Sequence, residues 1–145
     1  MGWFNYYGLA IIVLILIPNV VHAVICRGEM NNGGQNKALE IAEQIGRYAC
    51  MAFMVFNIPY SYFGFWFVNA FTVYLTVNGV LCLGYLIFWA VFKGGKRLAG
   101  ALSLSITPSV IFLFSGVILL SIPLIVSAVV FAVCHIRISI INAKK

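Results

Sequence analysis

The chain has 145 residues, of which 63% are hydrophobic and 8% are charged, and its formal net charge is +6. Soluble domains have roughly 45–50% apolar and about 25% charged residues, so this composition excludes an ordinary soluble domain. The nine basic residues stand between long uncharged runs, which indicates membrane topology rather than a nucleic-acid partner. We expect a single integral membrane domain over residues 1–145, multi-pass, surrounded by the lipid bilayer of the plasma membrane.

The first expected span covers residues 4–25, because no charge precedes Arg27 and about 20 helical residues cross a hydrocarbon core about 30 Å thick. The segment Val21-His22-Ala23 resembles a signal-peptide cleavage site, but no Lys or Arg precedes the apolar core, which favours an uncleaved span. Aromatic side chains typical of a membrane interface stand before this core: Trp3, Phe4, Tyr6 and Tyr7.

A polar segment follows the first span. Its Asn31-Asn32-Gly33-Gly34 string predicts a flexible turn, and Asn36 is placed to cap the next helix. Apolar residues then recur at intervals of three and four while charged residues take the other face. We expect an amphipathic surface turn that leads into a second span over residues 44–63.

The uncharged run 48–92 is too long for one crossing. Its 45 residues would make a helix of about 68 Å, more than twice the thickness of the hydrocarbon core. The strongest helix breakers are Asn57-Ile58-Pro59 and Phe63-Gly64, which places the third span at 65–91. Asn57 is expected to satisfy backbone groups that the break leaves free. Aromatic residues surround the break and form a second interfacial group: Tyr60, Tyr62, Phe63, Phe65, Trp66 and Phe67.

Residues 93–97 are predicted to form a loop, because three of the five are basic and two are glycine. The next uncharged run, 98–136, would be about 58 Å long as one helix and therefore also has to reverse. Ser121-Ile122-Pro123 is the favoured reversal, with Ser115-Gly116 as the alternative. The fourth and fifth spans are then expected at 98–120 and 123–141.

The distribution of Lys and Arg distinguishes five spans from four. With five spans and the N-terminus outside, all nine basic residues lie in the cytoplasm, whereas four spans would leave Arg137, Lys144 and Lys145 outside. The positive-inside rule favours the first arrangement. The predicted fold is an all-α polytopic bundle of five transmembrane helices, with the C-terminus cytoplasmic and both aromatic groups on the outer face; a four-helix bundle is the alternative.

A group of polar residues is expected at the cytoplasmic ends of the first, second and fifth spans. It comprises His22, Glu40, Glu43, Arg47 and His135. Two His and two Glu could bind a metal ion or relay a proton. The favoured interpretation is simpler, with Glu43 paired to Arg47 on a solvated helix face and both histidines hydrated and apart. There is no H-E-x-x-H motif, and we expect neither metal nor cofactor.

Polar and small residues suggest how the helices pack. The third span carries a polar stripe, Asn69, Thr72, Thr76 and Asn78, which we expect to face neighbouring helices. Small residues at four-residue steps favour close helix approach: Gly46 with Cys50, and Ala101 with Ser105 and Ser109. The four cysteines lack the paired spacing of a zinc or disulfide framework.

No motif in the chain specifies a reaction, a ligand or a cofactor. Transport, alone or as a permease component, is one expected function, and it would call for a homo-oligomer or a larger membrane complex because five helices are few for an enclosed pathway. A non-catalytic accessory or scaffold subunit is the alternative. A membrane enzyme acting at the cytoplasmic face ranks third, because only the His and Glu residues support it.

Overall fold

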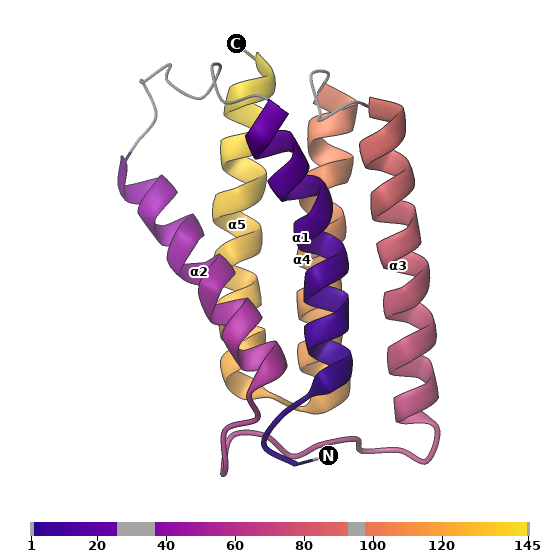
Figure 1. The fold of residues 1–145 in the computed structure, drawn as a ribbon. Coiled ribbons are helices and arrows are strands. Elements are labelled where there is room, and N and C mark those ends of the chain that lie inside the picture. Colours follow the sequence, from indigo (N-terminus) through magenta and orange to yellow (C-terminus); the bar gives the residue numbers. More distant parts are fainter. Residues whose placement is uncertain (1, 26–36, 93–97, 145) are drawn as a thin grey trace.

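The computed structural model describes residues 2–25, 37–92 and 98–144. These residues form five helices: α1 (Tyr6–Ile25), α2 (Lys37–Val55), α3 (Ala70–Phe92), α4 (Leu98–Leu119) and α5 (Ile122–Lys144). The helices run alternately up and down, so that the N-terminus and the C-terminus lie at opposite ends (Figure 1). Over the described ranges the only strand-like pairings are two isolated bridges. The predicted all-α bundle is confirmed.

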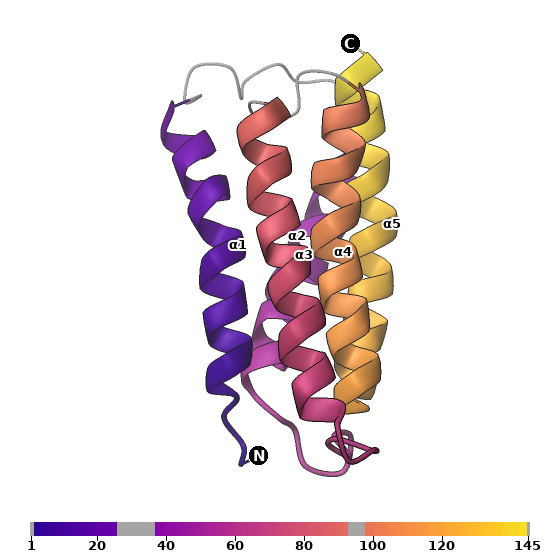
Figure 2. The same cartoon turned by 90° about the vertical axis from the view of Figure 1, so that its right-hand side faces the viewer.

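The five helices close into a ring. α1 packs beside α2 and α3, α5 packs beside α2 and α4, and α3 packs against α4. Figure 2 shows α4 and α5 side by side, with α1 at the opposite side of the view. This order brings α2 against α5, two helices that are far apart in the sequence. The core inside the ring includes Met54, Tyr74, Ile111, Phe112 and Leu124, each at most 1% exposed.

Within the described part of the chain, three helices are long and apolar enough to cross a membrane: α3, α4 and α5. α1 is apolar over Tyr6–Val21. α2 is more polar, because its first three turns contain Lys37, Glu40, Glu43 and Arg47. These helices fit a membrane protein.

The second helix ends at Val55, well before the end of the expected span at residue 63. Residues 56–69 form a loop across the end of the bundle, so α3 begins at Ala70 rather than at 65. Two residues of the loop, Tyr60 at φ 69° and Gly64 at φ 81°, have left-handed backbone conformations that a helix does not contain. The other three helices lie close to their expected ranges.

The chain reverses between α4 and α5 at Ser121, as predicted. Leu120 takes a left-handed conformation, with φ 48°, and ends α4. The alternative reversal at Ser115-Gly116 is wrong, because both residues lie inside α4. The 56–69 loop satisfies three backbone groups at this turn. Gly64 N donates to Leu119 O (3.0 Å), Phe63 N donates to Leu120 O (3.4 Å) and Ile122 N donates to Ser61 O (3.1 Å).

The N-terminal segment is joined to the end of α2 at the same end of the bundle. Asn5 N donates to Val55 O (2.7 Å), and Asn57 N donates to Trp3 O (2.9 Å). The Asn57 side chain also donates, through Nδ2, to Gly2 O (2.8 Å). Asn57 therefore satisfies a backbone carbonyl, but on the N-terminal segment rather than at the break that follows it.

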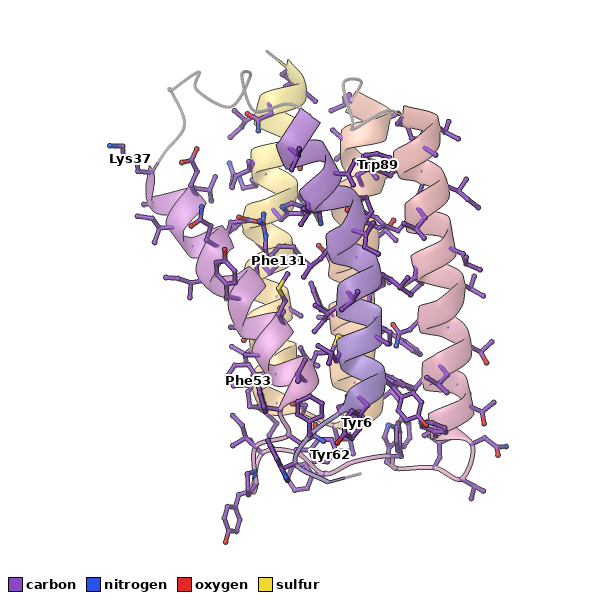
Figure 3. The ribbon with its side chains drawn as sticks, in the orientation of Figure 1. Tyr6, Lys37, Phe53, Tyr62, Trp89 and Phe131 are labelled. Carbon is purple, nitrogen blue, oxygen red and sulfur yellow. The ribbon has the colours of Figure 1, made fainter. Side chains whose placement is uncertain are left out.

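Both aromatic groups lie at this one end, which we call the aromatic end. Figure 3 shows Tyr6 and Tyr62 there, whereas Lys37 and Trp89 lie toward the other end. The second end, where α2 begins and α5 finishes, we call the basic end, because Lys37 and Lys144 lie there. The predicted turn at Asn31-Asn32-Gly33-Gly34, the Asn36 cap and the 93–97 loop lie outside the described residues.

Candidate functional site

Glu43 is a buried carboxylate between α2 and α5. It is 4% exposed and pairs with Arg47, four residues later on the same helix. Its Oε1 also lies 3.0 Å from Nδ1 of His135 on α5. The predicted pairing of Glu43 with Arg47 is confirmed, but the predicted solvated face is wrong, because this face of α2 packs against α5.

Gly46 explains how α2 comes so close to α5. A Cβ atom on Gly46 would lie 3.0 Å from both the N and the Cα of Phe131, so only glycine fits without a shift of backbone. Gly46 follows Glu43 by three residues and precedes Cys50 by four, and all three are buried. The small-residue face that was expected from Gly46 and Cys50 is therefore the contact that buries Glu43.

His135 is partly buried, with 23% of its side chain exposed. Its ring stacks on Phe131, with centroids 4.7 Å apart and an interplanar angle of 19°. An ionised carboxylate only accepts hydrogen bonds, so Nδ1 of His135 is the donor in its contact with Glu43. This fixes the tautomer of a neutral imidazole and leaves Nε2 as its acceptor.

A cavity of about 280 Å³ lies beside this cluster and is lined by residues from all five helices. Its charged or ionisable lining groups are Arg47, His135 and Tyr85. Apolar side chains form the deeper part of its wall: Ile15, Met51, Pro108, Phe112 and Phe131. Residues toward the basic end also line it: Trp89, Ala101, Leu104, Asn142 and Ala143. We call this cavity the basic-end pocket.

Two further polar contacts link helices around the basic-end pocket. Tyr85 OH on α3 donates to Oδ1 of Asn19 on α1 (3.0 Å). The hydroxyls of Ser105 on α4 and Ser139 on α5 form a hydrogen bond with each other. All four residues line the pocket, so polar groups from four helices converge there.

The rest of the predicted cluster does not join this site. Glu40 is exposed on α2 and does not line the pocket. The side chain of His22 lies outside the described residues. Among the residues that the structure places, no three His, Cys, Asp or Glu residues are grouped as metal ligands would be.

The predicted polar stripe of α3 divides into two faces. Asn78 is fully buried and exchanges hydrogen bonds with Ser115 on α4, at 3.1 and 3.3 Å. Asn69, Thr72 and Thr76 are exposed, so the expectation that they face neighbouring helices is wrong within this chain. Steps of three and four residues place them on one face, and Asn78 lies off that face.

Sequence reasoning missed most of the pocket. Tyr85, Trp89 and Ser139 carried no motif, and each looked like an ordinary residue of an apolar helix. The only weak signal in the sequence was that all three lie near the C-terminal ends of α3 and α5. Residues near the same ends of parallel helices can lie at the same height along the bundle axis. Only the helix order in the ring brings them together.

Comparison of this chain with models of protein families, with characterised proteins and with solved structures finds no match. The pocket is therefore the feature of the molecule that bears on its function.

Proposed function

We propose that the chain is a five-span protein of the plasma membrane that binds a small solute in the basic-end pocket, as a component of a transport system. The observation that carries this proposal is that side chains from all five helices line one cavity of about 280 Å³. Binding sites of small molecules are concave and combine apolar walls with a few polar groups.

The arrangement of charge supports the five spans. Lys37 begins α2 and Lys144 ends α5 at the basic end, while the opposite end carries exposed aromatic side chains such as Trp3 and Trp66. Basic residues concentrate on the cytoplasmic side of a membrane, and Trp and Tyr gather at its interfaces. The proposed orientation has the N-terminus outside and the C-terminus in the cytoplasm.

The polar lining supports a solute-binding role. Ionisable side chains inside a membrane bundle are costly, and they concentrate in substrate pathways and binding sites. Here Arg47, His135 and the Asn19–Tyr85 pair surround a space instead of filling it. A bundle that needed these groups only for packing would gain more by closing the cavity.

Filling the pocket tests this function. Ala101→Phe places a ring in the cavity, and Ala99→Phe is the matched control because Ala99 is exposed on the same helix. The protein is purified from membranes into lipid nanodiscs and denatured, and the released molecules are identified by mass spectrometry. We expect a small molecule at near-stoichiometric amount from wild type and Ala99→Phe, and its loss from Ala101→Phe. Equal amounts from all three would contradict a binding pocket.

An accessory subunit is the second candidate, favoured by the exposed Asn69 just before α3 and the exposed Thr72 and Thr76 on it, which none of the described helices covers. Exchange of the recovered molecule, isotopically labelled, across proteoliposomes separates the two. Exchange by wild type but not by Ala101→Phe supports transport, and binding without exchange supports the accessory role. The enzyme hypothesis gains nothing, because within the described residues His135 has no hydrogen bond to the pocket hydroxyls of Ser105 and Ser139.

A further inference from the structure

We propose that the ligand of the basic-end pocket is an apolar monocarboxylate, a compact aromatic or aliphatic group that carries one carboxylate. This inference rests on the proposed function, because it names the class of molecule that the pocket binds. It follows from the charge of the lining, from the geometry of Arg47 and from the division of the wall into polar and apolar parts.

The charge of the lining favours an anion. Arg47 and His135 line the cavity, and among the residues that the structure describes no acidic side chain does. Glu43 lies behind them, 4% exposed, and its carboxylate is already held by both side chains. A cationic solute would thus meet the positive charge of Arg47, with no accessible carboxylate in the described lining to pair with, whereas an anion would meet Arg47 directly.

Arg47 is oriented for a carboxylate. Its contact with Glu43 is made through one terminal nitrogen, and the side chain remains 38% exposed. A guanidinium has five N–H donors in a planar fork, which suits two-point binding of a carboxylate. Glu43 therefore positions the guanidinium while leaving other donors for a ligand. A protonated His135 would supply a further donor through Nε2, because Nδ1 is already directed at Glu43.

The deeper wall suits an apolar group. Phe112 and Phe131 meet edge to face, with centroids 5.6 Å apart, and both are almost fully buried. Met51 and Ile15 face the cavity from α2 and α1. The lining on α4 extends from Ala101 to Phe112, about 16 Å along the helix axis at 1.5 Å per residue. This length accommodates an aromatic ring or a short chain beyond the carboxylate.

Such a molecule has two possible sources. It can come from water at the basic end, where Asn142 and Ala143 line the cavity. It can also come from the bilayer between α1 and α2, because these helices are joined at the aromatic end by the Asn5–Val55 bond and diverge toward the basic end (Figure 1). The exposed Asn19 and the half-exposed Arg47 stand on the two sides of this opening.

Fluorescence of Trp89 offers a direct test, because Trp89 lines the pocket while Trp3 precedes α1 and Trp66 lies in the 56–69 loop, both at the aromatic end. The double variant Trp3→Phe/Trp66→Phe leaves one reporter. In phosphatidylcholine nanodiscs it is titrated with 4-iodobenzoate, 4-iodobenzyl alcohol and 4-iodobenzylamine, which differ mainly in charge and quench tryptophan on contact. A fourth titration with 10,11-dibromoundecanoate, a shorter fatty acid that partitions into the bilayer, tests entry from the bilayer.

We expect saturable quenching by a carboxylate and at least tenfold weaker quenching by the alcohol and the amine. Saturation by 4-iodobenzoate points to the water source, and saturation by 10,11-dibromoundecanoate alone points to the bilayer. Equal quenching by all three iodo probes that Ala101→Phe abolishes would overturn the monocarboxylate and leave the solute pocket in place. If no probe quenches, the monocarboxylate is again overturned. The solute-binding function itself is then tested by whether the native protein releases any small molecule on denaturation.

Arg47→Gln adds a matched comparison with Arg137→Gln on the same background, because Arg137 is exposed on α5 and does not line the pocket. Loss of the guanidinium should weaken carboxylate binding about tenfold to a hundredfold, the range for a hydrogen bond to a charged group. Arg137→Gln should leave binding unchanged. Equal weakening by the two variants would show a general effect of surface charge and overturn the role of Arg47. The comparison of probe charges in the background protein stands even if Arg47→Gln does not fold.

Discussion

At the aromatic end, backbone hydrogen bonds join the N-terminal segment, residues 56–69 and the turn between α4 and α5. At the basic end the described polar contacts between helices are made by side chains: Glu43 with His135, Asn19 with Tyr85, and Ser105 with Ser139. Backbone hydrogen bonds do not depend on the identity of most side chains, so they can hold the aromatic end together with many different residues there. The basic end depends on particular side chains, and it is there that the helices enclose a cavity.

The aromatic end therefore stabilises the bundle, whereas the basic end contains the side chains of the proposed binding site. A backbone bond is available to almost every residue, so the aromatic end can be stable without ionisable groups. A buried carboxylate is stable only when it is paired, so Glu43 at the basic end implies a constraint that packing alone does not impose. The following substitutions, from the largest expected effect to the smallest, test the contrast between the two ends.

Glu43→Gln should give the largest loss of stability, about 1.5–3 kcal/mol, the range for hydrogen bonds to charged groups. It removes the charge that Arg47 and His135 share, at a side chain that is 6% exposed. Glu40→Gln is the control, because Glu40 is exposed on the same helix. Unfolding in mixed micelles with increasing denaturing detergent measures both. Equal losses would show that the cluster at Glu43 does not hold the basic end together.

Gly46→Ala should cost about 1–3 kcal/mol, typical of overpacking a filled interior. The added Cβ would lie 3.0 Å from backbone atoms of Phe131 and would push α2 from α5. Gly79→Ala is the same substitution in α3, where nothing lies within 4 Å of the added atom, and it should be neutral or stabilising by up to about 1 kcal/mol. If Gly46→Ala were as well tolerated, the close approach of α2 and α5 would be refuted.

Asn5→Ala should cost about 1 kcal/mol at the aromatic end, the usual effect of losing a helix cap. Asn5 Oδ1 accepts from Gly8 N at 3.0 Å in the first turn of α1, and its Nδ2 donates to Tyr74 OH. Asn69→Ala, at an exposed residue just before α3, is the control and should change stability by less than about 0.5 kcal/mol. A loss for Asn5→Ala larger than that for Glu43→Gln would reverse the contrast between the ends.

The sequence predicted most helices because uncharged runs and breakers have simple physical meanings in a membrane. The reversal at Ser121 is an example, since Leu98 to Ile136 is too long for one crossing. The end of α2 was placed too late. Asn57-Ile58-Pro59 is a helix breaker just after Val55, but residues 56–63 are uncharged and largely aromatic, so hydropathy extends the expected span to residue 63. Tyr60 has a left-handed backbone conformation without being a glycine, so its residue type does not indicate the turn.

The sequence predicted three residues of the candidate site but not how they contact one another. Glu43, Arg47 and His135 were grouped because they lie near the same predicted side of the membrane. Whether they meet depends on which helices are neighbours, and no periodicity specifies that α2 lies against α5. The pocket could not be predicted from the sequence for the same reason, because it is formed by the arrangement of all five helices and not by any one of them.

The central claim is that the aromatic and basic ends lie on opposite sides of the membrane, with the basic-end pocket on the cytoplasmic side. In a variant without native cysteines, single cysteines replace Tyr60, which is 98% exposed, and Lys144, which is exposed at the end of α5. A membrane-impermeant maleimide is then applied to intact cells. The account predicts labelling of Tyr60→Cys, and labelling of Lys144→Cys only after the cells are opened. Labelling of both cysteines in intact cells would contradict it.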